Sequence, residues 1–392
     1  MAKRSVADAD VAGKRVLVRV DFNVPLDGGR IADDTRIRAA LPTVRLLQER
    51  GARVVLMSHL GRPKGAPAPD LYLAPVAERL GELLGVPVAM TGTAIGVEVE
   101  AAVAATKAGE VILLENLRFH VGEEANEPAF AAALARLGDI YVDDAFGAAH
   151  RAHASVVGVA ERLPAYAGLL LLQEVETLGR LLERPARPFV AILGGAKVSD
   201  KLGVVRRLLD RVDTLLVGGG MANTFLLGQG SEIGRSLAET ERVDDARKMM
   251  ARSAAEGATI VLPIDVVVAP EIAAERGAVV AIGRVPADQA IFDIGPQTVA
   301  LFGHQIAAAG TIFWNGPMGV FERPPFAAGT VGIARHVAAS PAFSVVGGGD
   351  SVAAIEQAGL TAAIDHISTS GGASLELLEG RTLPGLAVIP DA

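Results

Sequence analysis

The stretch FVAILGGAKVSDK, residues 189–201, contains the pattern that decides the fold. Its first five residues are all apolar, which is typical of a strand buried on both faces in a parallel sheet covered by helices. Two glycines and Lys197 follow, and between residues 200 and 211 leucine and valine recur at helical spacing. The stretch therefore predicts a strand, a tight glycine-containing turn and a helix.

The same succession recurs along the whole chain. Continuous apolar or β-branched runs occupy residues 16–20, 54–57, 111–114 and 140–142, and then residues 189–193, 214–217, 259–262, 311–314 and 343–346. Helical patterns separate these runs, for example over residues 33–50, where Gly51 closes the helix. The chain is therefore predicted to contain two α/β layers with parallel sheets, the first with four strands and the second with five.

Residues 168–183 separate the two groups of strands and have no strand character. Leucine and valine form a helical apolar stripe there, and Pro185 and Pro188 end it. We interpret this segment as a helix joining two α/β domains, which agrees with a length of 392 residues at roughly 100–200 residues per domain. An ordinary crossover helix within one large sheet is the alternative.

The composition excludes several classes of protein. Half of the residues are hydrophobic and 21% are charged, so the chain can bury large cores and is neither disordered nor collagen-like. The absence of cysteine excludes disulfide scaffolds, thiolate zinc sites, iron–sulfur clusters and thiol nucleophiles. The net charge of −8 disfavours nucleic acid as a partner. Because no apolar run suits a signal segment or a membrane span, we expect a cytoplasmic protein without membrane contact.

Glycine is in excess, with 44 residues against about 27 expected for this length. Twelve glycines lie just after the later strands or at the start of a helical pattern: Gly194-Gly195, Gly218-Gly219-Gly220, Gly316 and Gly319, Gly347-Gly348-Gly349, and Gly371-Gly372. Ligands bind beyond the carboxyl ends of parallel strands, and glycine lets backbone N–H groups approach a phosphate closely. The set therefore predicts a phosphate-binding region, although each turn taken alone also fits a tight connection from strand to helix.

The absence of several common nucleotide-binding motifs limits which phosphate-containing ligands the sequence suggests. Neither a P-loop, nor a dinucleotide fingerprint, nor the protein-kinase signatures are present. Lys197 and Lys201 stand four residues apart near a helix start, so both ammonium groups can point from one helix face at a polyphosphate, unless they are surface lysines. Asp350 follows three glycines and is a candidate Mg²⁺ ligand or a helix N-cap.

Polar side chains also follow the strands of the first half. They are Asp21 and Asn23, His59 to Arg62, Arg118, and His150 to His153, while Arg36 lies near the start of the helical pattern. Discrete arginine forks at strand ends suit a small, highly anionic substrate, although each arginine alone also fits a solvated surface charge. The histidines lack the spacing of metal ligands, and no G-x-S-x-G motif supports a Ser/His/Asp triad.

Motifs along the whole chain resemble those of the phosphoglycerate kinase family. In order they are VRVDFNVP (18–25), DTRI (34–37), SHLGRP (58–63), AFG (145–147), HRAHAS (150–155), LGGAKVSDK (193–201), GGGMA (218–222), WNGP (314–317), GVFE (319–322) and GGGDS (347–351). The resemblance implies two Rossmann-like, three-layer α/β/α domains with mainly parallel sheets that face each other across a cleft. It also implies reversible phosphoryl transfer from 1,3-bisphosphoglycerate to MgADP, giving 3-phosphoglycerate and MgATP.

The resemblance further implies a division of the chain. Residues 1–168, with a C-terminal tail of residues 380–392 packing back, would bind 3-phosphoglycerate or 1,3-bisphosphoglycerate. Residues 169–184 would form the interdomain helix and hinge, and residues 185–379 would bind MgADP or MgATP. These small molecules are the only partners implied, Mg²⁺ enters with the nucleotide, and a monomer is expected.

Site residues follow from the same resemblance, position by position. The substrate set would be Asp21, Asn23, Arg36, His59, Leu60, Gly61, Arg62, Arg118 and Arg151. The nucleotide set would be Gly195, Ala196, Lys197, Lys201, Gly219, Gly295, Asn315, Pro317, Glu322, Gly348, Gly349, Asp350 and Ser351, with Asp350 also holding Mg²⁺. The charge on the transferring phosphoryl group would be met by Arg36, Lys197, Lys201 and the N–H groups of Gly371 and Gly372.

Two positions depart from the pattern of the family. Ser370 stands where a third glycine usually precedes Gly371, which predicts a more restricted backbone there. Val175 stands between Glu174 and Glu176 where the family carries a lysine, which puts an interdomain ion pair in doubt.

Two other functions are alternatives. A non-catalytic protein that senses nucleotide or phosphate on the same fold would be expected to lack a charged catalytic residue, whereas Arg36, Lys197, Lys201 and Asp350 are all present. A nicotinamide-dependent dehydrogenase would need the glycine fingerprint that is missing.

Overall fold

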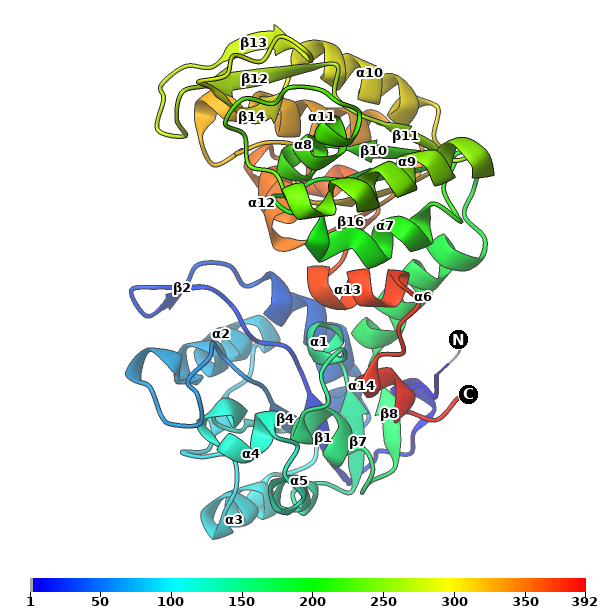
Figure 1. Ribbon diagram of the computed structural model, residues 1–392. Helices are drawn as coiled ribbons and strands as arrows, with labels where there is room; N and C mark the ends of the chain where they lie inside the picture. The colour runs from blue at the N-terminus through cyan, green and yellow to red at the C-terminus, as the bar shows by residue number, and fades with distance from the viewer. Residues whose placement is uncertain (1–2) are drawn as a thin grey trace. The chain divides into compact units, whose positions relative to one another are not determined.

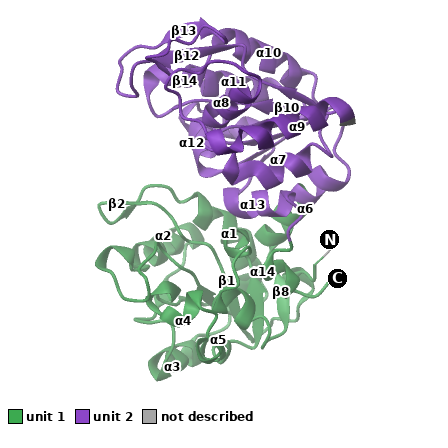
Figure 2. Cartoon of the chain, viewed as in Figure 1, with its two compact units in different colours: residues 1–177, 382–392 green, residues 178–381 purple. Residues whose placement is uncertain are grey.

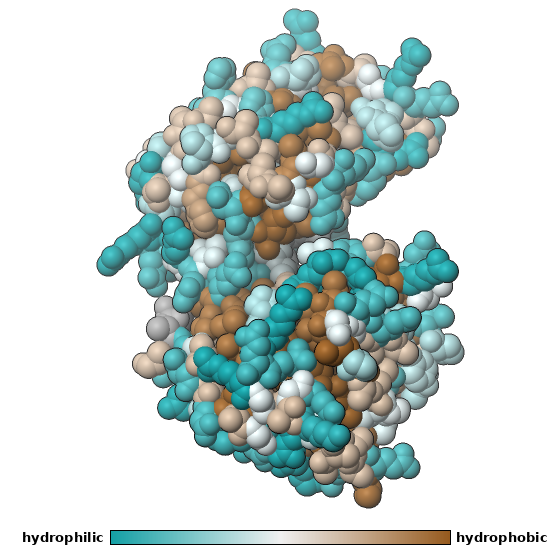
Figure 3. All heavy atoms as spheres, turned by 180° about the vertical axis from the view of Figure 1, so that it is seen from behind, coloured by the Kyte–Doolittle hydropathy of each residue, from teal (hydrophilic) through white to brown (hydrophobic). Residues whose placement is uncertain are grey.

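The computed structural model of the protein describes residues 3–392, which form two compact units (Figures 1 and 2). Unit 1 comprises the chain up to Thr177 together with Thr382–Ala392, and unit 2 comprises Leu178–Arg381. Hydrophilic side chains project over the face of both units shown in Figure 3. Among residues 3–392, no helix combines the length and the apolar character that a membrane crossing needs.

Unit 1 is built on a sheet of six parallel strands in the order β5-β6-β4-β1-β7-β8. Their bounds are β1 Arg15–Arg19, β4 Arg53–Met57, β5 Val88–Met90, β6 Val111–Leu113, β7 Ile140–Asp143 and β8 Ala165–Ala167. The four strands predicted in this half are confirmed. The three-residue strands β5 and β8 were not predicted, because a run this short has no readable period.

Helices cover both faces of this sheet. They are α1 Thr35–Glu49, α2 Ala74–Leu84, α3 Val97–Ala105, α4 Val121–Glu124, α5 Pro128–Ala135 and α14 Pro384–Ala387, and a hairpin of β2 Leu26–Asp27 and β3 Arg30–Ile31 precedes α1. Successive residues of β1 point to opposite faces. Val16 and Val18 therefore pack with α1 and α2, whereas Leu17 packs with α3 and α5. The unit is thus a three-layer α/β/α sandwich.

Unit 2 repeats this architecture with a second six-stranded parallel sheet, in the order β11-β10-β9-β15-β16-β17. Its strands are β9 Phe189–Leu193, β10 Thr214–Val217, β11 Thr259–Val261, β15 Thr311–Asn315, β16 Phe343–Gly347 and β17 His366–Ile367. Its helices are α7 Leu202–Leu208, α8 Gly219–Gly228, α9 Val243–Glu256, α10 Pro296–Ala307, α11 Ala328–Ala339, α12 Gly349–Gln357 and α13 Gly371–Leu378. All five strands predicted in this half are confirmed.

A separate antiparallel sheet was not predicted. Its strands are β12 Asp265–Ala269, β13 Ala278–Ala281 and β14 Ala290–Ile294, in the order β13-β12-β14. In the chain it lies between β11 and α10, and Figure 1 shows it at the end of unit 2. This sheet matters for function because β14 contributes to a cavity described below.

The predicted joining helix is present as α6, Leu169–Glu183, and the boundary between the units falls within it, after Thr177. The alternative of one large sheet is wrong, since the two groups of strands form separate sheets. The helix predicted over residues 33–50 is α1. The helix predicted from residue 200 is divided into a 3₁₀ turn, η6 Ser199–Lys201, and α7.

Candidate active site

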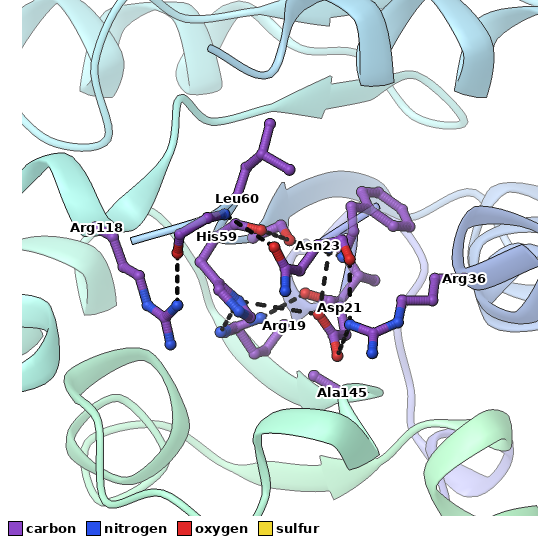
Figure 4. Close-up of polar contacts among 12 residues, drawn as sticks. Arg19, Asp21, Asn23, Arg36, His59, Leu60, Arg118 and Ala145 are labelled. Carbon is purple, nitrogen blue, oxygen red and sulfur yellow. Dashed lines mark hydrogen bonds and ion pairs between the residues drawn. The ribbon is translucent and has the colours of Figure 1, made fainter. Parts of the chain in front are cut away.

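In unit 1, the polar segments that follow β1 and β4 lie side by side. The two strands pair in parallel with Arg19 opposite Met57, so the residues just beyond them meet at the same edge of the sheet. The N–H of Gly61 donates to Oδ1 of Asn23 at 2.8 Å, and the N–H of Phe22 donates to Oγ of Ser58 at 2.9 Å. These bonds hold the two segments together, and Figure 4 labels Asn23 of the first segment and His59 and Leu60 of the second.

Arg36 is positioned by the same segment. Its Nη1 atom donates to Oδ2 of Asp21 at 3.0 Å and to the carbonyl of Asn23 at 3.2 Å. The side chain of Asp21 is 9% exposed, whereas that of Arg36 is 32% exposed. Asp21 therefore orients the guanidinium group of Arg36 while part of that group stays open to a ligand.

The other predicted substrate residues of unit 1 differ in accessibility. Arg118, on the 3₁₀ turn η3 Leu117–Phe119, is buried and donates from Nη1 to the carbonyl of Gly61 at 2.7 Å, and burial lowers its pKa. Leu60 is buried, and its backbone is held by two hydrogen bonds with the side chain of Asn116. Arg151 is half-buried, and Arg62 is exposed.

His59 lies among positive charges. Burial, the largest cause, and nearby guanidinium groups hold the pKa of His59 well below its usual value. The groups that act on it belong to Arg19, Arg118, Arg151 and Arg36. The predicted arginines other than the exposed Arg62 are therefore brought within electrostatic range of one imidazole ring. Such a concentration of fixed positive charge suits a small polyanion.

In unit 2, two cavities adjoin. The first, here called the glycine-lined cavity, has a volume of about 350 Å³ and is lined by residues 194–197, Asp200, Lys201, 315–317, 348–351, Gly371 and Leu375. The second, here called the apolar cavity, has a volume of about 330 Å³ and is lined by residues of α8, β14 and the segment 317–322, together with Leu237, Pro263, Val266 and Ile272. Gly195, Ala196, Pro317 and Asp350 line both cavities.

Two glycines at this place are required by close backbone contacts. Gly219 has φ +63°, and a Cβ there would lie 2.7 Å from the backbone nitrogen of Gly195. Gly316 has φ +95°, and a Cβ there would lie 2.4 Å from the carbonyl oxygen of Gly194 and 2.5 Å from Nζ of Lys201. A side chain at either position would therefore both strain the backbone and push the cavity walls apart.

The two predicted lysines line the glycine-lined cavity, but not as expected. Lys197 lies in an irregular segment before η6 and is exposed, so the expectation that both lysines share one helix face is wrong. Lys201 is 9% exposed, and its Nζ donates to the carbonyls of Gly194 at 2.7 Å and Asn315 at 2.9 Å. Burial lowers the pKa of Lys201 to about 8.

Asp350 lies in the first turn of α12 and is exposed where the two cavities adjoin. The N-cap alternative is wrong, because Gly348 occupies that position. Its neighbour Ser351 is buried, and Oγ of Ser351 accepts from the N–H of Gly316 at 2.6 Å. The amide of Asn315 likewise donates to the carbonyl of Gly347 at 3.0 Å. Ser351 and Asn315 therefore brace the loops, whereas the carboxylate of Asp350 stays open to a ligand.

The start of α13 places one of its two predicted glycines in a cavity wall and corrects the expectation for Ser370. Gly371 lines the glycine-lined cavity, and Gly372 next to it is exposed outside that lining. The expected restriction at Ser370 is wrong: its φ is −145°, an ordinary extended value, and its Oγ accepts from the N–H of Ala373. Serine therefore acts as the N-cap and leaves the N–H groups of both glycines unused by the cap. The other departure, Val175, is a buried apolar residue of α6.

Of the remaining predicted residues, Glu322 and Pro317 line the apolar cavity. Gly295 does not line either cavity: it caps α10 and packs against the carboxylate of Asp265. Within residues 3–392, no group of three or more histidine or acidic side chains is placed to hold a metal ion by itself.

Sequence reasoning missed several residues of these sites. The walls of the apolar cavity include Leu237, Ile272 and Phe292, and no motif marked them. Arg19 was also missed, although a charged residue inside an apolar strand was a visible signal. It is fully buried beside His59.

Comparison with known proteins agrees with this geometry. The family model of phosphoglycerate kinase matches residues 6–381. The whole chain is 57% identical to a phosphoglycerate kinase of Moorella thermoacetica and 59% identical to one of Rubrobacter xylanophilus, over 100% and 99% of those proteins. The solved phosphoglycerate kinases of Coxiella burnetii and Pyrococcus horikoshii OT3 superimpose with TM-scores of 0.88 and 0.87, at 45% and 36% identity, over 98% of each chain. The chain therefore belongs to the phosphoglycerate kinase family.

Proposed function

We propose that the chain performs the glycolytic phosphoglycerate kinase reaction, with MgADP or MgATP bound to unit 2 and 3-phosphoglycerate or 1,3-bisphosphoglycerate bound to unit 1. Membership of the family supports the reaction. The observation that carries the assignment of the nucleotide is the pair of adjoining cavities in unit 2, one lined by glycines and lysines and the other apolar. A nucleoside diphosphate has the matching pair of parts, a chain of phosphates and a flat base.

The apolar cavity is assigned to the base and the glycine-lined cavity to the phosphates. Leu237 and Ile272 are large apolar side chains that are 57% and 50% exposed, and both line the apolar cavity. Covering them with a base removes apolar surface from water. Glu322, in the same lining, is assigned to the ribose hydroxyls, which can donate to its carboxylate. The phosphates are assigned to the backbone at Gly195 and to the start of α12, where the N–H groups favour anions.

Unit 1 is assigned to the phosphoglycerate. Its carboxylate and phosphate are anionic at pH 7, which matches the arginines gathered around His59. Asp21 has a different task, since its carboxylate holds Arg36 in place. Arg62 is exposed, so it is assigned to the outer part of the substrate site.

The chemistry requires positioning and charge rather than proton transfer. The acyl carboxylate and the β-phosphate of ADP are both anionic already, so neither nucleophile needs a general base. The transferring phosphoryl group instead needs in-line placement and positive charge around its oxygens. We assign this charge to Arg36 from unit 1 and to Lys197, Lys201 and the N–H groups of Gly371 and Gly372 from unit 2.

Asp350 fits a Mg²⁺ ion carried in with the nucleotide. Mg²⁺ in proteins is commonly held by one or two carboxylates together with substrate phosphates and water, and Asp350 offers one exposed carboxylate beside the phosphate cavity. Bound there, the ion would supply neutralisation of charge on the phosphates. Lys201 and the glycine N–H groups orient the same phosphates from the protein.

Because the two sets of charged groups belong to different units, we expect the complete set to assemble only when both substrates are bound. Small-angle scattering tests this expectation: compaction with both substrates together, and not with either alone, supports it. An unchanged profile with both substrates would contradict the assembly step and leave the assignment of the nucleotide untouched. The same data test the expected monomer.

A coupled assay tests the activity itself. With 1,3-bisphosphoglycerate and MgADP, ATP should form, and its absence would overturn the proposal in favour of a non-catalytic sensor. Arg36→Ala should lower kcat by about a hundredfold or more, since one charge acting on the transition state is lost. ADP affinity should stay unchanged, because Arg36 belongs to unit 1. We also propose a cytoplasmic location, which imaging of a tagged chain would test.

A further inference from the structure

Four polar side chains form a buried chain of hydrogen bonds beneath the proposed phosphoglycerate site. They are Glu123, Ser155, Arg19 and His59, which are 0%, 0%, 0% and 6% exposed. Only His59 is a predicted substrate residue. The other three reach it in sequence, and Arg19 makes the last link (Figure 4).

The direction of each bond is set by which group can donate. Oγ of Ser155 donates to Oε1 of Glu123 at 2.6 Å, and the N–H of Ser155 donates to Oε2 at 3.0 Å. Oγ of Ser155 in turn accepts from Nε of Arg19 at 2.8 Å. The Nη1 atom of Arg19 donates to the carbonyl of Val20. The guanidinium group is therefore held by acceptors on two sides, which fixes the direction of its remaining N–H groups.

The last bond joins Nη2 of Arg19 and Nδ1 of His59, 3.0 Å apart. A guanidinium group has donors and no acceptor, so Nδ1 must present its lone pair and cannot carry the proton. Oδ1 of Asp21 lies 4.0 Å from Nδ1, too far for a hydrogen bond that would draw a proton there. If the ring is neutral, its one proton is consequently on Nε2.

The charges around the ring keep it neutral. Arg19 from β1, Arg36 from α1, Arg118 from η3 and Arg151 all oppose a second proton, and Asp21 at 4.0 Å is the acidic group in its ion-pair range. Burial acts in the same direction and is the larger cause, so the pKa of His59 lies well below its usual value. No residue within 3–392 makes a hydrogen bond with Nε2 of His59. This nitrogen is also absent from the set of fully buried polar atoms without a partner, so it faces accessible space.

We propose that Arg19 is a positioning residue that fixes His59 as the neutral Nε2–H tautomer, so that His59 offers a single N–H donor to an oxygen of the phosphoglycerate. Ser155 and Glu123 hold Arg19 in the orientation that this requires. The tautomer follows from the contacts of unit 1 alone, whereas its use by the substrate rests on the proposed function.

Nitrogen-15 NMR of the whole chain labelled at histidine tests the tautomer directly and without substrate. The signals of His59 are identified by their loss in His59→Gln. We expect the pattern of a neutral ring protonated on Nε2, unchanged between pH 6 and pH 8. A ring protonated on Nδ1, or an imidazolium at pH 7, would overturn the proposal. Because no ligand is present, this result does not depend on the proposed activity.

Kinetics of Arg19→Met test the positioning role. Without the donor to Nδ1, we expect the KM for 3-phosphoglycerate to rise roughly tenfold, as for a lost hydrogen bond to a charged group. This KM should also become dependent on pH between 6 and 8, while the KM for ATP stays unchanged. If Arg19 had a merely structural role, its replacement would not make the KM for 3-phosphoglycerate dependent on pH, and it would not change that KM while leaving the KM for ATP unchanged. Arg15→Met is the matched control, since Arg15 lies on the same strand and pairs with Asp139 away from this cluster.

The outcomes distinguish the proposed tautomer of His59 from the proposed activity on phosphoglycerate. If the wild-type chain shows the Nε2–H tautomer but does not act on 3-phosphoglycerate, the proposed function fails and the tautomer stands. If Arg19→Met does not fold, the NMR measurement on the wild-type chain still decides whether His59 is the neutral Nε2–H tautomer that the contact with Arg19 requires. An unchanged KM in a folded Arg19→Met would overturn the positioning role.

Discussion

The buried ammonium group of Lys201 donates a hydrogen bond of 2.7 Å to the backbone carbonyl of Gly194. Together with the bond to Asn315, it ties the end of β9 to the end of β15, where the glycine-lined cavity begins. Lys201 is thus both a candidate for contact with the phosphoryl group and a brace of the cavity. Because burial lowers its pKa to about 8, its charge is sensitive to pH.

The rate should therefore depend on the protonation of Lys201. We expect kcat/KM for ADP, which reports the enzyme without nucleotide, to fall as the pH rises through about 8, because the neutral amine cannot stabilise phosphate charge. With ADP saturating, kcat/KM for 1,3-bisphosphoglycerate should fall only at higher pH, since bound phosphates favour the ammonium form. A series of initial rates from pH 7 to 9.5 checks both, and identical profiles for the two substrates would contradict this role.

Gly219→Ala should weaken nucleotide binding selectively. The added Cβ would lie 2.7 Å from the nitrogen of Gly195 at a φ of +63°, so the wall shared by the two cavities must shift. We expect the KM for ADP to rise roughly tenfold or more, at about 1.4 kcal/mol per factor of ten. The KM for 1,3-bisphosphoglycerate should not change. Gly92→Ala is the control, because Gly92 is exposed and a Cβ there meets nothing within 4 Å.

Asp350→Asn should reduce the effect of Mg²⁺ on nucleotide binding. If the carboxylate of Asp350 holds the ion with the phosphates, then Mg²⁺ strengthens ADP binding more in the wild-type chain than in the variant. Calorimetry of ADP with and without Mg²⁺ measures this difference, for which we expect roughly a tenfold loss, about 1.4 kcal/mol. An equal gain from Mg²⁺ in both proteins would remove Asp350 from the metal site.

Asp144→Asn should change how stability depends on pH. Asp144 is fully buried, and its Oδ1 accepts from the N–H groups of Leu170 and Leu171 at the start of α6. Burial raises its pKa from 3.8 to about 8, so between these values the folded chain binds a proton that the unfolded chain has lost. Stability of the wild-type chain therefore falls as the pH rises from about 4 to 8. The Tm of the variant, relative to wild type, should be higher at pH 8 than at pH 5.

Asp139→Asn is the control of opposite sign. The hydrogen bond from Arg15 lowers the pKa of Asp139, so its stabilising contribution is present above the unfolded pKa and is lost as the pH falls through the folded value. This variant should melt below wild type at pH 7 and approach it at pH 3. Parallel behaviour of the two variants would show that burial does not govern Asp144.

Local patterns were enough to predict the two large sheets. Strands such as β9 and β15 are buried on both faces, so they are continuous apolar runs that can be recognised without knowing their neighbours. The strands that were missed lack this property. β17 has two residues, and β13 is mostly exposed at the edge of the antiparallel sheet, so neither has a clear apolar pattern.

In the candidate site, too, some features could be predicted from local patterns and others could not. Glycines and charged residues that follow strands were predictable, because parallel strands bring their carboxyl ends to one edge. What each side chain does there was not. Lys197 and Lys201 line one cavity without sharing a helix face, and Ser370 is an unstrained N-cap where a restricted backbone was expected.

The sequence by itself determined two α/β layers, a joining helix and a likeness to one family, and it predicted a phosphate-binding region, because all of these depend on short stretches of chain. Only the tertiary structure decided that an apolar cavity adjoins the glycine-lined one, and that Arg19 meets Ser155 across 136 positions of the sequence and donates to His59. The physical reason is that a hydrogen bond depends on distance and on which atom donates. Both are set when segments remote in the chain pack together, and neither leaves a local pattern in the sequence.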